Sequence, residues 1–268
     1  MKKRLWFSWL VLLSLLLILS GCGTGNTTGS SKSNAQVQPQ EIIVSAAASL
    51  QDSLTELEQT YRQRNPGVKL TFNFDASGTL QKQIEQGAPV DLFISAGKSQ
   101  VDALNQKNLL VKDSEINLLG NDLVLVVGKD NTDVKTIQDL TQASVQKISI
   151  GTPESVPAGK YAQESLIKLQ LWDTLQPKFV FAKDVTQVLN YVEMGNAEAG
   201  LVYKSDVQGS TKVTVVATVP ADSHQAIVYP AGVVAATKNK QVAEDFLKYL
   251  QSPEAQQVFV KHGFSILE

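Results

Sequence analysis

The sequence predicts an α/β fold with mainly parallel sheets flanked by helices, in two lobes with a ligand cleft between them. The first observation is a repeated unit, in which a short apolar strand leads through a turn of small residues into an amphipathic helix. The second is the length from residue 41 to 268, which exceeds one average domain. The third is a pair of apolar segments, 121–129 and 226–237, that we expect to cross between the lobes.

The repeated unit begins at residues 41–48, a β-branched strand. Ser49 with Asp52 three residues later has the pattern of a capping box, and Asn65-Pro66-Gly67 is expected to end the helix. The later strands, each followed by a helix, are 68–74 with its turn 75–79, 91–95 before 98–109, 147–150 before a helix from about Ala158, and 178–182 before 184–192. We therefore predict a first lobe of residues 41–120 plus 230–268 and a second lobe of about 121–229.

Residues 1–22 have the layout of an export signal. Three basic residues precede an apolar run from Leu5 to Leu19, which is shorter than the roughly 20 residues of a membrane-spanning helix. The run ends in Leu19-Ser20-Gly21-Cys22, which resembles the lipobox of bacterial lipoproteins, in which the cysteine is acylated. Residues 23–40 are polar and predict a flexible tether. These features predict a lipid anchor at Cys22 on the extracytoplasmic face of the membrane; a cleaved signal with a free thiol is the alternative.

The composition of the mature chain argues against several kinds of partner. Without the signal, 21 basic residues face 26 acidic ones, a formal charge of −5, which argues against nucleic acid. Cys22 is the single cysteine, and the chain contains two histidines, so a metal site built directly from side chains is poorly supplied. We expect no cofactor and no metal held by side chains.

The turns between strands and helices carry the candidate ligand-binding residues Ser49, Ser77, Ala158 and Val185. In parallel sheets the ligand lies beyond the carboxyl ends of the strands, where helix N-termini present free amides. Neutral N–H and O–H donors at several helix starts would suit an oxyanion, with no cation required. The alternative is that the two serines cap their own helices. Asp184, beside Val185, is expected to act as such a cap.

A resemblance to a known family rests on short segments in a fixed order: Ala46-Ala47-Ala48-Ser49-Leu50, Ser77-Gly78-Thr79-Leu80, Gln86-Gly87-Ala88-Pro89, Asp91 to Ala96, Val156-Pro157-Ala158-Gly159, Leu171-Trp172-Asp173, Asp184-Val185, Leu201-Val202-Tyr203, Ser205-Asp206 and Asp222-Ser223-His224. Each segment alone is a weak signal. Together they make residues 41–268 similar to the periplasmic molybdate-binding proteins of ABC transporters.

This resemblance implies a type II periplasmic-binding-protein fold and a site that holds molybdate, or tungstate, as the intact oxyanion. It places the serine ligands at Ser49 and Ser77, the amide ligands at Ala158 and Val185, and a tyrosine hydroxyl ligand at Tyr203. It also implies a monomer that delivers the oxyanion to the permease subunits of an ABC importer. Gly78 departs from relatives that have a small hydroxyl residue there, and we expect this turn to be looser.

Other interpretations remain open at this point. Tyr203 could be a core aromatic residue whose hydroxyl binds a carbonyl. The S-x-x-K pattern of serine acylases occurs at Ser95 to Lys98 and at two other places, without its usual partner motifs, so a serine hydrolase is the less favoured alternative. A binding protein for sulfate or a carboxylate and an adaptor without ligand are the others. A site of donors without a carboxylate would disfavour phosphate, which carries a proton near neutral pH.

Overall fold

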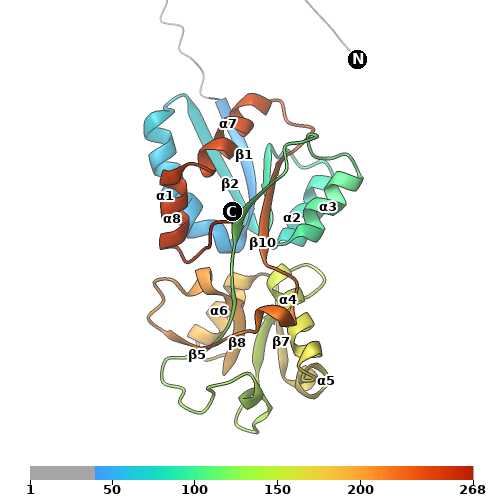
Figure 1. The fold of residues 1–268 in the computed structure, drawn as a ribbon, viewed down its shortest axis with the longest axis vertical. Helices are drawn as coiled ribbons and strands as arrows, with labels where there is room; N and C mark the ends of the chain where they lie inside the picture. The colour runs from blue at the N-terminus through green and yellow to red at the C-terminus, as the bar shows by residue number, and fades with distance from the viewer. Residues whose placement is uncertain (1–39, 268) are drawn as a thin grey trace, which may run out of the picture. The chain divides into compact units, whose positions relative to one another are not determined.

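The computed structural model describes residues 40–267, which belong to one compact unit (Figure 1). The predicted signal, the predicted lipidation at Cys22 and nearly all of the predicted tether lie outside the described residues. Within residues 40–267, no helix combines the length and apolar character needed to cross a membrane.

Ten strands and eight α-helices form the described chain. The strands are β1 Gln40–Ala47, β2 Val68–Asp75, β3 Leu92–Ile94, β4 Ile116–Gly120, β5 Leu123–Gly128, β6 Ile148–Gly151, β7 Phe179–Ala182, β8 Ala199–Tyr203, β9 Val213–Thr218 and β10 Val228–Val233. The helices are α1 Gln51–Arg64, α2 Ser77–Glu85, α3 Lys98–Gln106, α4 Pro157–Lys168, α5 Trp172–Leu175, α6 Val185–Glu193, α7 Lys240–Leu250 and α8 Pro253–Lys261. Short 3-10 helices include Ala48–Leu50 and Lys204–Val207.

The first sheet has the strand order β2-β1-β3-β10-β4. β1 pairs in parallel with β2 and β3, whereas β10 is antiparallel to both β3 and β4, so β4 again runs in the direction of β1. In Figure 1 the helices α1, α7 and α8 lie on one side of this sheet, and α2 and α3 lie on the other. The carboxyl ends of β1, β2 and β3 therefore share one edge.

The second sheet repeats this plan with the order β7-β6-β8-β5-β9. β6 pairs in parallel with β7 and β8, and β5 is antiparallel to β8 and β9. In each sheet one strand, β10 or β5, opposes the other four. Both are the strands that follow a crossing between the sheets, because the chain leaves the first sheet after β4 and returns to it at β10.

The predicted two-lobed α/β fold is confirmed by these two sheets and their helices. One local prediction is wrong: Ser49 and Asp52 do not form a capping box. The chain enters α1 through the 3-10 helix Ala48–Leu50, and Leu50 occupies the N-cap position of α1 without a side-chain hydrogen bond in the described structure. Because the 3-10 turn places Ser49 one residue too early to cap α1, its hydroxyl is left for other partners.

Candidate ligand-binding site

A small cavity lies where the carboxyl ends of strands from both sheets face each other. It holds about 200 Å³ of space between atoms, a volume that includes open solvent, so the cavity is narrow in this structure. It is lined by Ala47, Ala48, Ser49, Asp75, Ala76, Ser77, Ala96, Val156, Pro157, Ala158, Val185 and Tyr203. The structure thus brings all five predicted site residues together around one cavity, two from the first lobe and three from the second.

Ser77 is the first residue of α2 and is almost fully buried. Its Oγ accepts a hydrogen bond of 3.0 Å from the backbone N–H of Ala96, and no capping bond to its own helix is formed in the described structure. The capping alternative therefore does not describe this serine. Since its oxygen already accepts from Ala96, the hydroxyl proton is available to donate to a ligand in the cavity.

Ser49 reaches the cavity from the 3-10 helix that follows β1. Its Oγ lies 2.9 Å from the hydroxyl of Tyr229 on β10, and either atom could donate on distance alone. No side-chain capping bond is recorded at the starts of Ala48–Leu50 or α1 within residues 40–267. Both predicted serine positions thus hold hydroxyls that the helices do not use.

The second lobe contributes two helix N-termini. Val185 is the first residue of α6, and Ala158 is the second residue of α4, after Pro157. The first N–H groups of a helix have no carbonyl partner within it, and the helix dipole makes this end favourable for an anion. The prediction that Asp184 caps α6 is confirmed, because its Oδ1 accepts 2.7 Å from the N–H of Gln187. Its charge is therefore engaged with the helix.

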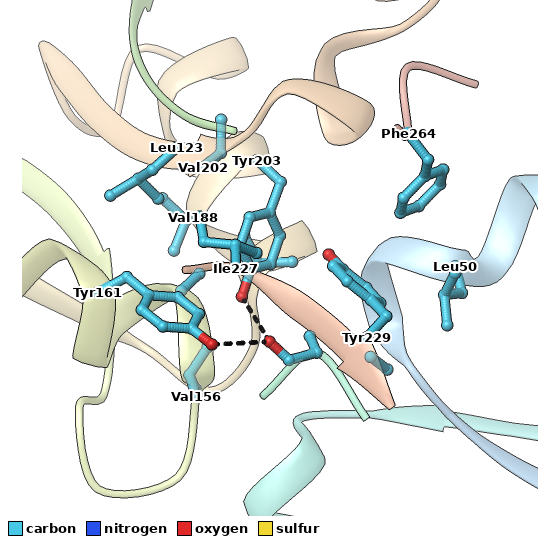
Figure 2. Close-up of a cluster of buried hydrophobic side chains, with 14 of the residues drawn as sticks. Leu50, Leu123, Val156, Tyr161, Val188, Val202, Tyr203, Ile227, Tyr229 and Phe264 are labelled. Carbon is cyan, nitrogen blue, oxygen red and sulfur yellow. Dashed lines mark hydrogen bonds between the residues drawn. The ribbon is translucent and has the colours of Figure 1, made fainter. Parts of the chain in front are cut away.

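Tyr203 ends β8 and is 1% exposed. Figure 2 shows its hydroxyl converging with that of Tyr161, and both point at the carbonyl oxygen of Ala96, at 3.4 and 3.5 Å. Burial raises the pKa of both phenols above the usual value, so both stay protonated and remain donors. Hydrogen bonds this long are weak, which leaves two buried donors poorly satisfied beside the cavity. Sequence reasoning missed Tyr161, which lies on the buried face of α4 and looks like an ordinary core residue.

The lobes meet closely at Gly78. Its N–H donates 2.9 Å to the carbonyl of Ser155 in the second lobe. A Cβ atom on Gly78 would lie 2.6 Å from that oxygen and 2.8 Å from the Cα of Ser155. The expectation that glycine loosens this turn is therefore wrong. The absence of a side chain is what allows the backbones of the two lobes to approach and to form this hydrogen bond.

The lining of the cavity includes one carboxylate that the sequence analysis did not predict there. Asp75, at the end of β2, belongs to its lining, although its Oδ1 accepts 2.7 Å from the N–H of Ala76. Among the described residues that line the cavity, none is a lysine or arginine. The lining therefore offers neutral donors, and one carboxylate lies at its edge.

A family model for bacterial extracellular solute-binding proteins matches residues 42–265. The chain belongs to this family. Its members are binding proteins for solutes outside the cytoplasm and are not enzymes, so the serine-hydrolase alternative is excluded. The S-x-x-K patterns seen in the sequence therefore have no catalytic meaning here.

Individual relatives agree with this assignment. The chain is 43% identical to YvgL of Bacillus subtilis (strain 168), a protein named by inference as an ABC transporter substrate-binding lipoprotein, over 94% of this chain and 95% of the relative. It is 41% identical to the molybdate-binding protein ModA of Haemophilus influenzae (strain ATCC 51907 / DSM 11121 / KW20 / Rd), over 84% and 90%. The predicted resemblance is confirmed.

A solved structure gives the same result for the fold. It is the substrate-binding domain of a protein from Clostridium difficile assigned to a molybdenum ABC transporter. It is 46% identical, with a TM-score of 0.68 over 85% of this chain and 99% of that one.

The buried carboxyl group of Asp206, near the site, makes the stability of the protein depend on pH. Burial raises the pKa of Asp206 to about 7, with Asp184 and Asp52 adding to the rise and the N–H of Tyr203, which donates 2.8 Å to Oδ2, opposing it. The folded protein then holds a proton that the unfolded chain releases between about pH 4 and 7. The free energy of unfolding contributed by Asp206 therefore falls as pH rises through this window.

We expect Asp206→Asn to unfold at the same urea concentration as the wild type at pH 4, and to be more stable above pH 7, by about 1 to 3 kcal/mol. The asparagine oxygen keeps the acceptor for Tyr203 while the charge is lost. Urea unfolding of both proteins at pH 4 and pH 8 measures the difference. An equal difference at the two pH values would show that folding does not raise the pKa of Asp206.

Proposed function

We propose that this chain captures molybdate, and also tungstate, outside the cytoplasm and delivers it to the permease subunits of an ABC importer. The observation that carries the proposal is the convergence of uncharged donors from two lobes on one small cavity. The names of the relatives favour molybdate among the oxyanions.

We assign the binding of the oxyanion to the hydroxyls of Ser49, Ser77 and Tyr203 and the backbone amides of Ala158 and Val185. Hydrogen bonds to a charged group contribute about 1.5 to 3 kcal/mol each, so five donors give roughly 8 to 15 kcal/mol before the costs of dehydration and lobe closure. Micromolar affinity requires about 8 kcal/mol net. A neutral site can therefore bind the dianion without an arginine or a metal ion.

In this proposal the two lobes, residues 41–120 plus 230–268 and 121–229, close on the oxyanion. The bond from Gly78 to Ser155 and the contact of Tyr161 with Ala96 link the lobes beside the ligand. The molecule acts as a monomer, tethered to the extracytoplasmic face of the membrane through acylated Cys22. The lipoprotein name of the Bacillus subtilis relative supports this anchor.

Thermal unfolding of the fragment from residue 41 with four oxyanions tests the ligand. We expect molybdate and tungstate to raise the melting temperature in proportion to the logarithm of their concentration, because only the folded protein binds them. Sulfate and phosphate should have little effect: sulfate is smaller, and phosphate near neutral pH carries a proton.

Phosphate is the demanding control because the Asp75 carboxylate could accept a hydrogen bond from an anion that carries a proton. The site remains an oxyanion site if sulfate or phosphate stabilises the fragment as strongly as molybdate, but the assignment of molybdate would then be wrong. Calorimetry with the same four anions gives the affinities.

A further inference from the structure

The hydroxyl of Ser49 is the end of a chain of hydrogen bonds that begins at the crossing between the lobes. Asn121 lies between β4 of the first sheet and β5 of the second. Its Nδ2 donates 3.2 Å to the hydroxyl of Tyr229 and 2.9 Å to the Oγ of Ser205. Tyr229, at the start of β10, in turn lies 2.9 Å from Ser49 Oγ. Asn121 and Tyr229 thus belong to the two segments by which the polypeptide crosses between the lobes.

The orientation of the Asn121 amide is fixed by a further bond. Its Oδ1 accepts 2.9 Å from the backbone N–H of Asp122, so the NH₂ group must face Tyr229 and Ser205. An NH₂ group donates and does not accept. The oxygen of Tyr229 is therefore occupied as an acceptor by Asn121.

The direction of the next bond follows from the phenol proton of Tyr229. The 2.9 Å contact with Ser49 Oγ fits either direction on distance alone, but among the described residues Ser49 Oγ is the recorded partner of Tyr229 that can accept this proton, since Asn121 only donates. The ring is fully buried and packs edge to face against Phe264 at 5.3 Å, so the hydroxyl has little freedom to turn elsewhere (Figure 2). The protons then run from Asn121 to Tyr229 and from Tyr229 to Ser49, which leaves the Ser49 proton to point into the cavity.

Ser77 has the same arrangement by a different route, because the N–H of Ala96 occupies its oxygen. Both serines are therefore acceptors toward the protein and donors toward the cavity. A serine held in this way donates its one proton to an unprotonated oxyanion oxygen, and because the protein already uses one of its two lone pairs, it is a poorer acceptor for an oxyanion that carries a proton.

We propose that Tyr229 and Asn121 are positioning residues that hold the Ser49 hydroxyl as a donor to the oxyanion and so contribute to selection against protonated oxyanions. This inference rests on the proposed function, because it assigns Ser49 to the ligand. Neither residue touches the cavity itself, and both act through Ser49.

Calorimetry of Tyr229→Phe tests the proposal. Without the phenol proton, Ser49 is free to accept as well as donate. We expect the affinity for molybdate to fall about tenfold and the preference for molybdate over phosphate to fall with it. In a Ser49→Ala background the same substitution should change the affinity less than about twofold. Asn121→Ala should add nothing to Tyr229→Phe, because both act through one bond.

Tyr61→Phe is the matched control, since Tyr61 is also buried in the first lobe and packs against Phe246 away from the cavity. It should leave both affinities unchanged. Loss of affinity from Tyr229→Phe that is equally large with and without the Ser49 hydroxyl would indicate a packing role and overturn the proposal. Unchanged affinity and selectivity would do the same.

A second measurement separates this inference from the proposed function. Neutron diffraction of the deuterated wild-type protein without ligand should show the Tyr229 deuterium directed at Ser49 Oγ. A deuterium from Ser49 directed at Tyr229 would overturn the proposed direction, whatever the protein binds. If none of the four oxyanions binds the wild type, the proposed function fails, and the selective role of Tyr229 fails with it.

Discussion

Gly78→Ala is expected to weaken oxyanion binding roughly 30-fold or more. A methyl group at this position would meet the carbonyl oxygen and Cα of Ser155 at 2.6 and 2.8 Å, both backbone atoms of the opposite lobe. Overpacking of this kind costs about 1 to 3 kcal/mol, and the bond from Gly78 N–H to Ser155 is lost as the lobes move apart. Each lobe supplies part of the donor set. If the lobes cannot approach fully, the donors of one lobe no longer reach the ligand.

The ligand-free protein should remain folded, because position 78 is helical and alanine suits a helix better than glycine. Gly67→Ala is the matched control, since no atom lies within 4 Å of the methyl group it would add. Calorimetry gives the affinities, and small-angle scattering with and without molybdate reports whether the variant still closes. An affinity for molybdate equal to that of the wild type would mean that this contact is not part of the closed, bound form.

Much of the site could be predicted from the sequence because, in this fold, the order of strands and helices along the chain determines where the turn residues lie. In a parallel strand-helix unit, the residue after each strand must lie at the carboxyl edge of the sheet. Ser49, Ser77, Ala158 and Val185 each follow a strand in this way, and Tyr203 ends one. Local pattern therefore predicted that the four turn residues converge, whereas the family resemblance added Tyr203, and the roles of all five as ligands remain proposals.

The remaining features depend on contacts between distant segments. Tyr229 lies 180 positions from Ser49, and Tyr161 reaches Ala96 from the other lobe. No periodicity in the sequence distinguishes these tyrosines from core aromatic residues, and both are in fact buried. The importance of Gly78 was also invisible, because it depends on how closely the backbone of Ser155 approaches. Predictions from local pattern fail where two lobes meet.

The serines provide the second large effect. We expect Ser49→Ala and Ser77→Ala each to weaken molybdate binding by about 1 to 3 kcal/mol, since each removes a donor to a charged ligand. The double variant should lose more than either single one. Calorimetry measures both. The cost to folding should be small, because neither hydroxyl caps a helix in the described structure, although Ser49→Ala also leaves Tyr229 without its acceptor.

Ser53→Ala is the control that separates ligand binding from stability. Its hydroxyl is also buried and donates 3.0 Å to the carbonyl of Leu50, but it does not line the candidate cavity. We expect this variant to melt at a lower temperature and to bind molybdate as the wild type does, which is the reverse of the result for Ser77→Ala. Two donors are lost in the Ser49→Ala, Ser77→Ala protein, and the three that remain come from the second lobe alone. Such a protein should no longer gain stability from molybdate, because closure would bring almost no new contact to the ligand. If it were stabilised as strongly as the wild type, the oxyanion would have to be held elsewhere than between these two lobes.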